Sequence, residues 1–557
     1  MSGRRGGGKR DGKPNRGRVS GSGKSGGIAG GENAVHGNPR RTNAGESEHA
    51  KARRGSGAAG AGFGRSSSRT AKAPRALGGV PVTAGQRVDC EIIGLTHDGE
   101  GVGRVDGYTL FVRGAVPGER VEAEVASIGK SFGRARMTKV LDAGDSRRVA
   151  PPCPIYDSCG GCQLQHLEYG EQLRWKRQHV VNALTRIGKL AVAGEGGGAA
   201  AEGAAAADRQ SARLPVIVHP TIGMDEPWRY RNKAQVPIGH GEGGLIGGFY
   251  EMGSHDIVDM DGCLIQQDEN VDTVRAVKEA ARLLSVSAYN RATGRGLLRH
   301  VVVRHARTTG QRMVVLVTNG RDIPHVRELV GLIRERVPGV VSICQNVQTA
   351  ATPVVFGEET RTLWGEDVIY DEIGGIRFAI SPRSFFQVNP EQTERLYGKA
   401  VEYAALTGSE TVIDAYCGIG TISLFLARHA DRVYGVEIVP EAIEDARSNA
   451  RLNGIANAKF EAGAAEVVMP RWQAEGVQPD VIVVDPPRKG CDPALIATML
   501  ELRPERIVYV SCDPSTLARD LRLLEDGGYR TVEVQPVDMF PHTTHVECVI
   551  GMQRIDT

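Results

Sequence analysis

The sequence contains no run of about eighteen or more apolar residues, and therefore no transmembrane helix is expected. The segment Met1–Arg5 also lacks the apolar stretch that opens a secretory signal. These two absences predict a cytoplasmic protein with no membrane partner. Only ten cysteines are present, and four of them have an uneven, ligand-like spacing. In a cytoplasmic chain such spacing favours metal binding or catalysis over a disulfide framework.

Charge is distributed unevenly along the chain, although the overall formal charge is only +3. Residues 1–76 contain 17 Lys and Arg against 4 Asp and Glu, so this segment carries +13 and the remainder −10. A basic arm attracts polyanions such as RNA, because it neutralises phosphates and releases counterions. A solvated tail that keeps the protein in solution is an equally good interpretation.

Length and composition predict several folded units and two low-complexity segments. A chain of 557 residues is too long for one ordinary domain. Residues 1–78 consist mainly of Gly, Ser, Arg and Ala, which cannot bury enough apolar surface to fold, so a disordered basic tail is expected. A second Gly- and Ala-rich piece, residues 193–213, is expected to be an insertion loop without chemistry.

Residues 80–141 alternate short apolar runs with glycine turns. Val88–Ile93 and Tyr108–Val112 are two such runs, and Val121–Val125 alternates apolar with acidic or small residues. Strands of this length and spacing predict a small OB-like β-barrel. A basic patch near one end of this segment favours RNA binding, although a small barrel can also be a structural spacer. The patch consists of Lys130, Arg134, Arg136 and Lys139.

The C-terminal region, residues 376–557, alternates apolar strands with helices. Pro440–Ala446 is typical of a helix start, because proline and early acidic residues suit the first turn. Continuous apolar strands with intervening helices predict an α/β fold with a doubly wound, mostly parallel, Rossmann-like sheet. The strand-like runs are Thr411–Asp414, Arg432–Glu437, Val481–Asp485 and Arg506–Val510.

A glycine-containing loop, Asp414–Thr421, follows the first of these strands directly. Its glycines let the backbone approach a ligand at the edge where such sheets bind cofactors. The full dinucleotide fingerprint is missing, because residue 423 is Ser. Glu437 ends the next strand, where a carboxylate can hold two ribose hydroxyls, and Asp485 ends a later one. These acids predict a nucleotide-type cofactor, with simple acidic helix caps as the alternative.

Five stretches resemble the RNA 5-methyluridine methyltransferase family, and they occur in the family's order. They are Phe385–Asn389 (FFQVN), Asp414–Gly420 (DAYCGIG), Asp485–Gly490 (DPPRKG), Ser511–Pro514 (SCDP) and His542–Glu547 (HTTHVE). The resemblance spans about residues 83–557 and includes the barrel, which resembles a TRAM domain. The basic tail and the Gly/Ala insertion have no counterpart in the family.

The resemblance implies a methyltransferase that depends on S-adenosyl-L-methionine (SAM) and has a Rossmann-like domain. Tyr416 takes an aromatic position that is Phe in some members of the family. The implied SAM contacts are Gln387, Tyr416, Glu437 and Asp485, with further contacts expected at Thr421 and Glu466.

Cys512 lies just past a strand, at the sheet edge where catalytic groups collect. Carbon 5 of uracil is a weak nucleophile, but addition of a thiolate at carbon 6 gives an enolate whose carbon 5 can attack an activated methyl group. A carboxylate must then remove the proton from carbon 5. The resemblance assigns the nucleophile to Cys512 and the base to Glu547. We also expect surroundings that lower the pKa of the Cys512 thiol. Asp513 and His545 are expected to be caps or core polar groups.

Four cysteines in the middle of the chain form a candidate metal site. Cys153, Cys159 and Cys162 are clustered, and Cys263 follows far downstream. This set suits an iron–sulfur cluster, with a four-cysteine zinc site as the rival. One branch of the family has the same arrangement and holds a [4Fe-4S] cluster, so the resemblance favours iron. Residues 142–375 are therefore expected to form a central α+β iron–sulfur and RNA-binding domain.

Two segments of the central region interleave basic and aromatic residues. Trp175–Arg177 is expected to begin a basic helix, and Arg229–Lys233 is the second segment. Such segments can clamp phosphates and stack a splayed base, although a solvated surface is an equal alternative. The target base must leave its stack to reach Cys512, so a pocket for a flipped uridine is expected.

The expected function is formation of 5-methyluridine in RNA by a monomeric enzyme. Large-subunit (23S) ribosomal RNA is the favoured substrate, and the T-loop uridine of transfer RNA comes second. An RNA cytosine-5 methyltransferase is an alternative, but Arg488 stands after Pro487 where those enzymes carry cysteine. An exocyclic amino methyltransferase would need an aromatic residue at the same position. A non-catalytic RNA-binding protein is the last alternative, and the pair of Cys512 and Glu547 disfavours it.

Overall fold

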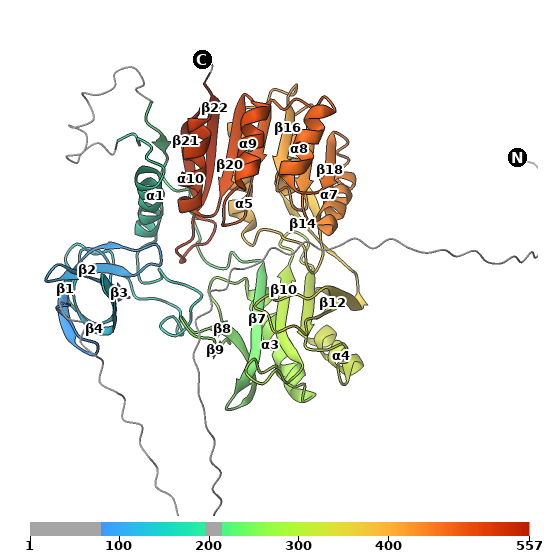
Figure 1. The fold of residues 1–557 in the computed structure, drawn as a ribbon. Coiled ribbons are helices and arrows are strands. Elements are labelled where there is room, and N and C mark those ends of the chain that lie inside the picture. Colours follow the sequence, from blue (N-terminus) through green and yellow to red (C-terminus); the bar gives the residue numbers. More distant parts are fainter. Residues whose placement is uncertain (1–79, 195–213, 556–557) are drawn as a thin grey trace, which may run out of the picture. The chain divides into compact units, whose positions relative to one another are not determined.

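The computed structural model describes residues 80–194 and 214–555 (Figure 1). The predicted tail, residues 1–78, and nearly all of the predicted insertion, residues 193–213, lie outside these ranges. The two ends of the insertion lie next to each other, because Val192 and Val216 form a parallel bridge.

The first described unit is a closed five-stranded barrel with the strand order β1-β2-β3-β5-β4. Apolar residues alternate with polar ones along its strands, so that Leu110, Val112 and Val121 fill the interior. Arg134 and Arg136 project outward from β5 and are exposed. The predicted barrel is confirmed. Its strands are β1 (Arg87–Leu95), β2 (Gly101–Val105), β3 (Tyr108–Arg113), β4 (Arg120–Ile128) and β5 (Phe132–Asp142).

The second unit is a seven-stranded mixed sheet with the order β13-β12-β11-β10-β7-β8-β9. Helix α3 (Asp268–Leu283) packs on β7, β8 and β10, and α4 (Val326–Arg336) packs on α3. Ala234, Val236 and Val303 face this helical layer. The strands are β7 (Lys233–Gly241), β8 (Gly244–Tyr250), β9 (Ile257–Asp259), β10 (Leu298–His305), β11 (Arg312–Thr318), β12 (Val340–Val347) and β13 (Glu359–Gly365).

The third unit is an eight-stranded sheet with the order β18-β17-β16-β19-β20-β22-β21-β6. Strands β16 to β20 run parallel, and β22 returns antiparallel beside β20. The predicted Rossmann-like sheet is therefore confirmed. A separate hairpin, β14 (Ile369–Ile373) and β15 (Ile376–Ile380), precedes it. The main strands are β16 (Thr411–Ala415), β17 (Arg432–Glu437), β18 (Ala458–Ala462), β19 (Val481–Val484), β20 (Arg506–Ser511), β21 (Tyr529–Val537) and β22 (Glu547–Arg554).

The helices of this sheet begin with strong local signals. Proline opens four of them, and the side chains of Asn389, Asp492 and Asp513 accept hydrogen bonds from backbone N–H groups of the first turns. The helix start predicted at Pro440 is confirmed. The helices are α5 (Pro390–Ala404), α6 (Thr421–Ala427), α7 (Pro440–Leu452), α8 (Ala465–Ala474), α9 (Pro493–Leu502) and α10 (Pro514–Asp526).

Two elements from earlier in the chain complete the sheet. Helix α1 (Tyr169–Arg186) packs on α10, and β6 (Ile217–Val218) adds a parallel edge strand to β21. The helix start predicted at Trp175 is wrong, because α1 begins six residues earlier.

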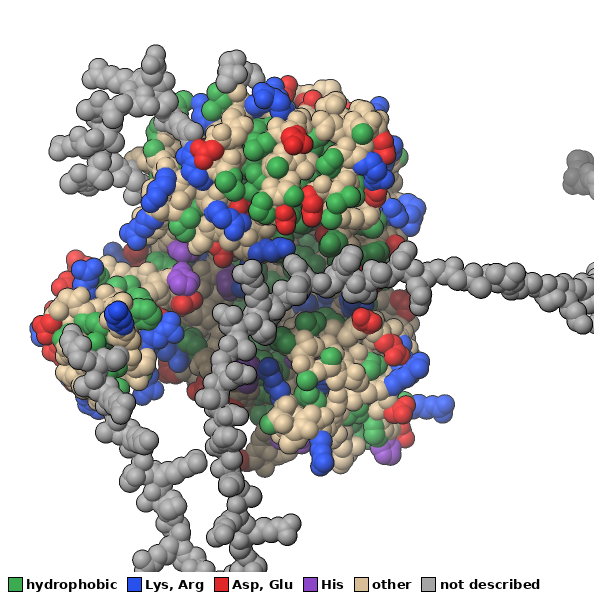
Figure 2. Space-filling view, viewed as in Figure 1, with side chains coloured by type: hydrophobic (Ala, Val, Ile, Leu, Met, Phe, Trp, Pro, Cys, Tyr) green, Lys and Arg blue, Asp and Glu red, His purple; other side chains and the backbone are tan. Residues whose placement is uncertain are grey.

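Acidic and basic side chains are interspersed over the visible surface of the described residues (Figure 2).

Candidate active site

Cys512 and Glu547 lie opposite each other at the carboxyl edge of the eight-stranded sheet. Strand β20 ends at Ser511, which pairs with Cys548 of the antiparallel strand β22. Cys512 follows Ser511 and Glu547 precedes Cys548, and Glu547 lies close enough that its charge raises the pKa of the Cys512 thiol. Cys512 is partly exposed, whereas Glu547 is buried with 5% of its surface accessible. The fold thus brings together two residues that are 35 positions apart in the sequence.

Burial and neighbouring carboxylates control the protonation of this pair. Burial, and then Asp485, raise the pKa of Glu547 well above its usual range. Burial also raises the pKa of Asp485, to about 6. Burial, Glu547 and Asp485 together raise the pKa of Cys512 to about 12. The expectation of a lowered thiol pKa is therefore wrong for the protein alone, because the sulfur is partly buried and two carboxylates share its site.

Arg488 is the cation that opposes these shifts, since its charge lowers the pKa of both Cys512 and Glu547. Its guanidinium lies 3.4 Å from Nε2 of His545. Burial, and then Arg488, lower the pKa of His545 to about 4, so this imidazole is neutral near pH 7. Asp513 caps α10 by accepting from two backbone N–H groups, as the sequence indicated.

The glycine-containing loop joins β16 to α6 and lies beside the end of β17. Tyr416 adopts a left-handed conformation with φ of 68°, and its N–H donates to the carbonyl of Val436 at 3.0 Å. A side chain at position 418 would meet no atom within 4 Å of its Cβ, so open space lies beside Gly418 in this turn. Glu437 accepts from the Val439 N–H at 3.0 Å. The loop can therefore admit a ligand close to its backbone.

The remaining predicted cofactor contacts lie before α5, at the start of α6 and in α8. Gln387 is buried, and its carbonyl accepts from the Asn232 side chain at 3.1 Å. Thr421 opens α6 and accepts from the Tyr397 hydroxyl at 3.3 Å. Glu466, in the first turn of α8, lies near enough to Tyr416 that its charge helps to raise the pKa of that phenol.

The four predicted metal ligands line one cavity of about 410 Å³. All ten cysteines of the chain lie in the described ranges and all are free thiols. Burial raises the pKa of Cys162 to about 12, and the charges of the other three cysteines add to this shift. Within residues 80–194 and 214–555, however, no group of three or more His, Cys, Asp or Glu side chains is arranged to hold a metal ion. A cluster site is therefore not shown.

The same cavity reaches from the cysteines to Arg488, whose charge acts on Cys512. Its walls also include Arg231, Arg488, Phe540 and His545. Arg231 lies over the Phe540 ring at 5.9 Å, and Phe540 meets His545 edge-on at 6.0 Å. A cavity with cationic and aromatic walls suits a splayed nucleotide.

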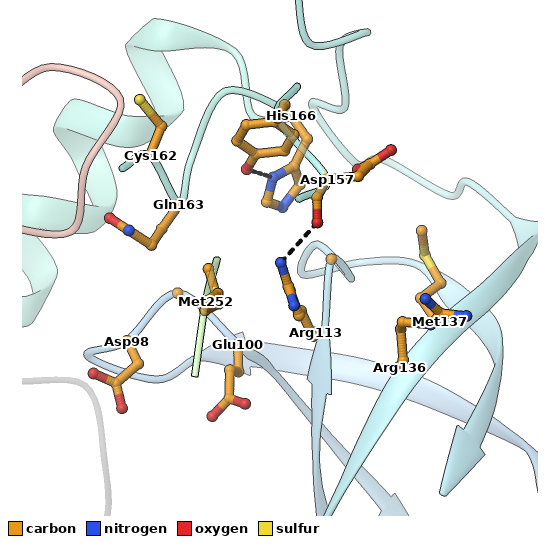
Figure 3. A pocket seen from close by; sticks show the side chains of 13 residues that line it. Asp98, Glu100, Arg113, Arg136, Met137, Asp157, Cys162, Gln163, His166 and Met252 are labelled. Atoms are coloured by element: carbon orange, nitrogen blue, oxygen red, sulfur yellow. Dashed lines mark hydrogen bonds between the residues drawn. The ribbon is translucent and has the colours of Figure 1, made fainter. Parts of the chain in front are cut away.

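A second cavity, of about 360 Å³, lies between strands of the barrel and the cysteine segment (Figure 3). The Arg113 side chain donates to the carbonyl of Asp157 at 3.0 Å. Beside it, the Tyr156 hydroxyl and Nδ1 of His166 are 2.6 Å apart. The first bond connects the barrel to the segment that carries Cys159 and Cys162, and the second lies within that segment.

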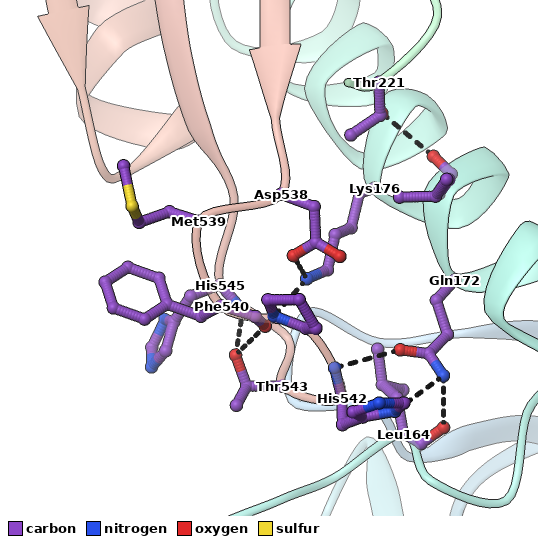
Figure 4. Close-up of polar contacts among 12 residues, drawn as sticks. Leu164, Gln172, Lys176, Thr221, Asp538, Met539, Phe540, His542, Thr543 and His545 are labelled. Carbon is purple, nitrogen blue, oxygen red and sulfur yellow. Dashed lines mark hydrogen bonds and ion pairs between the residues drawn. The ribbon is translucent and has the colours of Figure 1, made fainter. Parts of the chain in front are cut away.

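The loop before Glu547 is held by α1, a feature that sequence reasoning missed (Figure 4). Lys176, expected on a basic surface, is fully buried and forms an ion pair with Asp538. It also donates to the carbonyl of Phe540 at 3.1 Å. No signal at Asp538 predicted this pairing, because it joins residues 362 positions apart.

His542 fixes the same loop to the cysteine segment. Its carbonyl accepts from the backbone N–H groups of Gln163 and Leu164, each at 3.0 Å. Its ring stacks on Trp228 with 3.6 Å between the centroids. Gln172 of α1 accepts from the His542 N–H at 3.1 Å. The segment around Cys162 and the strand that starts at Glu547 are therefore coupled through one residue.

Comparison with known proteins decides the family. Residues 372–555 match the model of the tRNA (Uracil-5-)-methyltransferase family, and residues 81–138 match the TRAM domain. An uncharacterized RNA methyltransferase of Halalkalibacterium halodurans is 57% identical over 473 residues, covering 85% of this chain and 98% of that protein. The chain belongs to the RNA 5-methyluridine methyltransferase family. Its barrel is accordingly a TRAM domain, and the protein is a SAM-dependent RNA (uracil-C5)-methyltransferase.

Other relatives of this methyltransferase agree with the assignment. An uncharacterized RNA methyltransferase of Listeria innocua is 50% identical over 464 residues, covering 83% of this chain and 97% of that protein. Among solved structures, the Pyrococcus abyssi tRNA (uracil-54, C5)-methyltransferase in complex with S-adenosyl-L-homocysteine has a TM-score of 0.63 at 28% identity. That match covers 84% of this chain and 100% of the other.

In the part of the methyltransferase that the structure describes, no helix has both the length and the apolar character to cross a bilayer.

Proposed function

We propose that this enzyme methylates carbon 5 of a uridine in large-subunit ribosomal RNA through a covalent bond between Cys512 and carbon 6. The observation that supports this proposal best is the juxtaposition of Cys512 and Glu547 across the end of β20 and β22. A thiol and a buried carboxylate at one sheet edge match the two groups that the reaction needs, a nucleophile and a base.

The reaction begins when the partly exposed Cys512 thiol gives its proton to solvent and the thiolate sulfur adds to carbon 6 of the ring, whose double bond to carbon 5 opens. Arg488 assists this step, because its charge favours the thiolate. The resulting enolate makes carbon 5 nucleophilic, and carbon 5 would then bond to the methyl group of the donor, whose sulfur would keep the electrons of the broken methyl–sulfur bond. Glu547 removes the remaining proton from carbon 5, and the electrons of that bond expel the Cys512 thiolate from carbon 6. The raised pKa of Glu547 makes its carboxylate a stronger base, which suits it for taking this proton and holding it until the product leaves.

We assign the SAM contacts to Gln387, Tyr416, Glu437 and Asp485, with Thr421 and Glu466 at the margin of the site. The open space beside Gly418 and the acids at the strand ends fit such a donor. When bound, SAM supplies an electrophilic methyl group on a sulfonium centre. The carboxylate of Asp485 lies on the same edge as Cys512 and favours a positively charged donor there.

We assign the four cysteines to a [4Fe-4S] cluster with a structural or RNA-positioning role. Four free thiols that line one cavity provide the donor atoms that an iron–sulfur cluster takes. The residues around Cys162 bond directly to the loop that leads to Glu547. A group bound at the cysteines would therefore stabilise the catalytic edge, although the reaction itself needs no electron transfer.

The T-loop uridine of transfer RNA is the second candidate substrate. The solved structure from Pyrococcus abyssi favours this substrate, because that protein is a tRNA (uracil-54, C5)-methyltransferase. Mass mapping of ribosomal and transfer RNA from a strain that lacks the protein separates the two. Loss of 5-methyluridine from ribosomal RNA alone supports the proposal, and loss from transfer RNA alone contradicts it.

A further inference from the structure

The barrel touches the loop that leads to Glu547 at a glycine in the turn between β1 and β2. Gly99 is buried and has a φ of 79°. A methyl group at this position would lie 3.1 Å from Cγ2 of Thr544 and 3.3 Å from Cδ2 of Leu164. Both distances are shorter than an ordinary contact between carbon atoms, which is about 3.5–4.0 Å. The backbone of the barrel therefore packs directly against the loop and leaves no room for a side chain.

Hydrogen bonds close the turn itself, residues 96–100. The Thr96 N–H donates to the Glu100 carbonyl at 2.8 Å, and the Gly99 N–H donates to the Thr96 carbonyl at 3.0 Å. The Thr96 hydroxyl also accepts from the Glu100 N–H at 3.1 Å. A turn closed by these bonds presents a fixed surface to the loop.

Other contacts hold the barrel, the cysteine segment and the loop together. Arg148, just after the barrel, pairs with buried Glu119 at 2.6 Å and forms an antiparallel bridge with Leu167. The Leu164 N–H donates to the His542 carbonyl at 3.0 Å, at the start of the loop (Figure 4). These contacts oppose a movement of the barrel away from the loop.

The turn packs on the approach to the proposed base, and not on the strand that carries the nucleophile. Thr544 stands three residues before Glu547, whereas Cys512 directly follows β20 of the sheet. A change at Gly99 should therefore disturb the base more than the nucleophile.

We propose that the turn between β1 and β2 is a positioning element for Glu547, which acts through the contact of Gly99 with Thr544. The inference rests on the proposed function, since it takes Glu547 as the base. The barrel then has a part in the removal of the proton from carbon 5, in addition to any contact that it makes with RNA.

The test compares two glycine-to-alanine variants of the full-length enzyme. Gly99→Ala places a methyl group against Thr544. Gly107→Ala, in the turn between β2 and β3, is the matched control, because Gly107 has a φ of 81° and a Cβ there would meet nothing within 4 Å. Both variants incur similar backbone strain, and only the first pushes on the loop. Thr544→Ser removes the methyl group nearest to position 99, so the double variant Gly99→Ala/Thr544→Ser relieves the closest contact.

The substrate is total RNA from a strain that lacks the protein, with its uridine tritiated at carbon 5. Release of tritium measures the loss of the proton, and a labelled methyl donor reveals the methylated covalent adduct on denaturing gels. We expect Gly99→Ala to release tritium roughly tenfold more slowly and to accumulate the adduct, because a small misplacement of a catalytic group slows its step. Its affinity for the RNA in filter binding should match the wild type. Gly107→Ala should behave as the wild type throughout, and the double variant should recover part of the rate.

Three outcomes would overturn the proposal. An equal loss of rate in Gly107→Ala would show that backbone strain alone is responsible. Weaker RNA binding by Gly99→Ala, with normal tritium release from the bound RNA, would make the turn an RNA contact. A double variant as slow as Gly99→Ala would exclude the contact with Thr544 as the cause. Tritium release by the wild type reports separately on the proposed function.

Discussion

Lys176 and Asp538 form an ion pair in which both side chains are fully excluded from solvent. The pair joins α1 to the loop that follows β21, and the Tyr169 hydroxyl donates to the same carboxylate at 3.0 Å. Because the loop runs on to Glu547, this pair helps to hold the segment that leads to the proposed base. The arrangement suggests that α1, although far away in the sequence, is part of the catalytic unit.

Breaking this pair from one side should be more damaging than removing both charges. Lys176→Met leaves Asp538 as an unpaired buried charge and should lower the free energy of unfolding by about 3–5 kcal/mol. Asn at position 538 still accepts from Tyr169, so the double variant Lys176→Met/Asp538→Asn should recover part of the loss. Urea unfolding of the wild type and of each variant measures this. A double variant less stable than Lys176→Met would contradict the account.

Arg488 should set the pH at which the nucleophile becomes reactive. Its charge lowers the pKa of Cys512 and of Glu547, so Arg488→Gln should raise both. At a given pH less thiolate then forms, and the rising limb of the pH–rate profile should move to higher pH. Initial rates of capture of 5-fluorouridine RNA between pH 6 and pH 10 test this. Lys489→Gln, the adjacent exposed cation, is the matched control and should leave the profile in place.

Glu547→Gln should stop the reaction after methyl transfer. Glutamine has a similar shape but cannot accept the proton from carbon 5, so the Cys512 thiolate cannot be expelled. We expect a methylated covalent adduct to accumulate on ordinary uridine RNA, with turnover reduced by roughly 10²–10⁴-fold. Denaturing gels with a labelled methyl donor detect it. Release of normal product at the wild-type rate would assign the proton transfer to another group.

The four-cysteine cavity should contain iron and sulfide in the protein purified without oxygen. Cys162→Ser should lose both, whereas Cys344→Ser, at a buried cysteine of β12, should keep them. Elemental analysis and the acid-labile sulfide assay give the answer. Zinc without sulfide in the wild type would contradict the cluster and favour a four-cysteine zinc site. Loss of the cluster should also increase proteolytic cleavage near His542, because that residue bonds to the chain after Cys162.

Local patterns in the sequence were sufficient for much of the fold. Alternation along Val121–Val125 and the proline at 440 reflect local geometry, and the barrel and α7 form where they were expected. The strand ends at Glu437 and Asp485 could likewise be located, because parallel strands bring their carboxyl ends to one edge. The family motifs identified Cys512 and Glu547 as a pair, and the register of β20 and β22 gives the physical reason.

Long-range contacts could not be predicted in the same way. Lys176 resembles a surface lysine in its local sequence, and its burial is stabilised by Asp538 and the Phe540 carbonyl, both far away in the sequence. The raised pKa of Cys512 also escaped prediction, since it depends on Glu547 and Asp485 approaching from other strands. The sequence also did not predict that β6 joins the edge of the methyltransferase sheet, because this pairing is another long-range contact.

The most direct test of the central claim is to identify the protein atom that is joined to RNA. The full-length enzyme is incubated with 5-fluorouridine RNA and SAM, digested with protease and nuclease, and analysed by tandem mass spectrometry. The account predicts a methylated fluorouridine on the peptide that contains Cys512, and no adduct in Cys512→Ser. An adduct on another residue, or methylated RNA formed by Cys512→Ser at the wild-type rate, would contradict it.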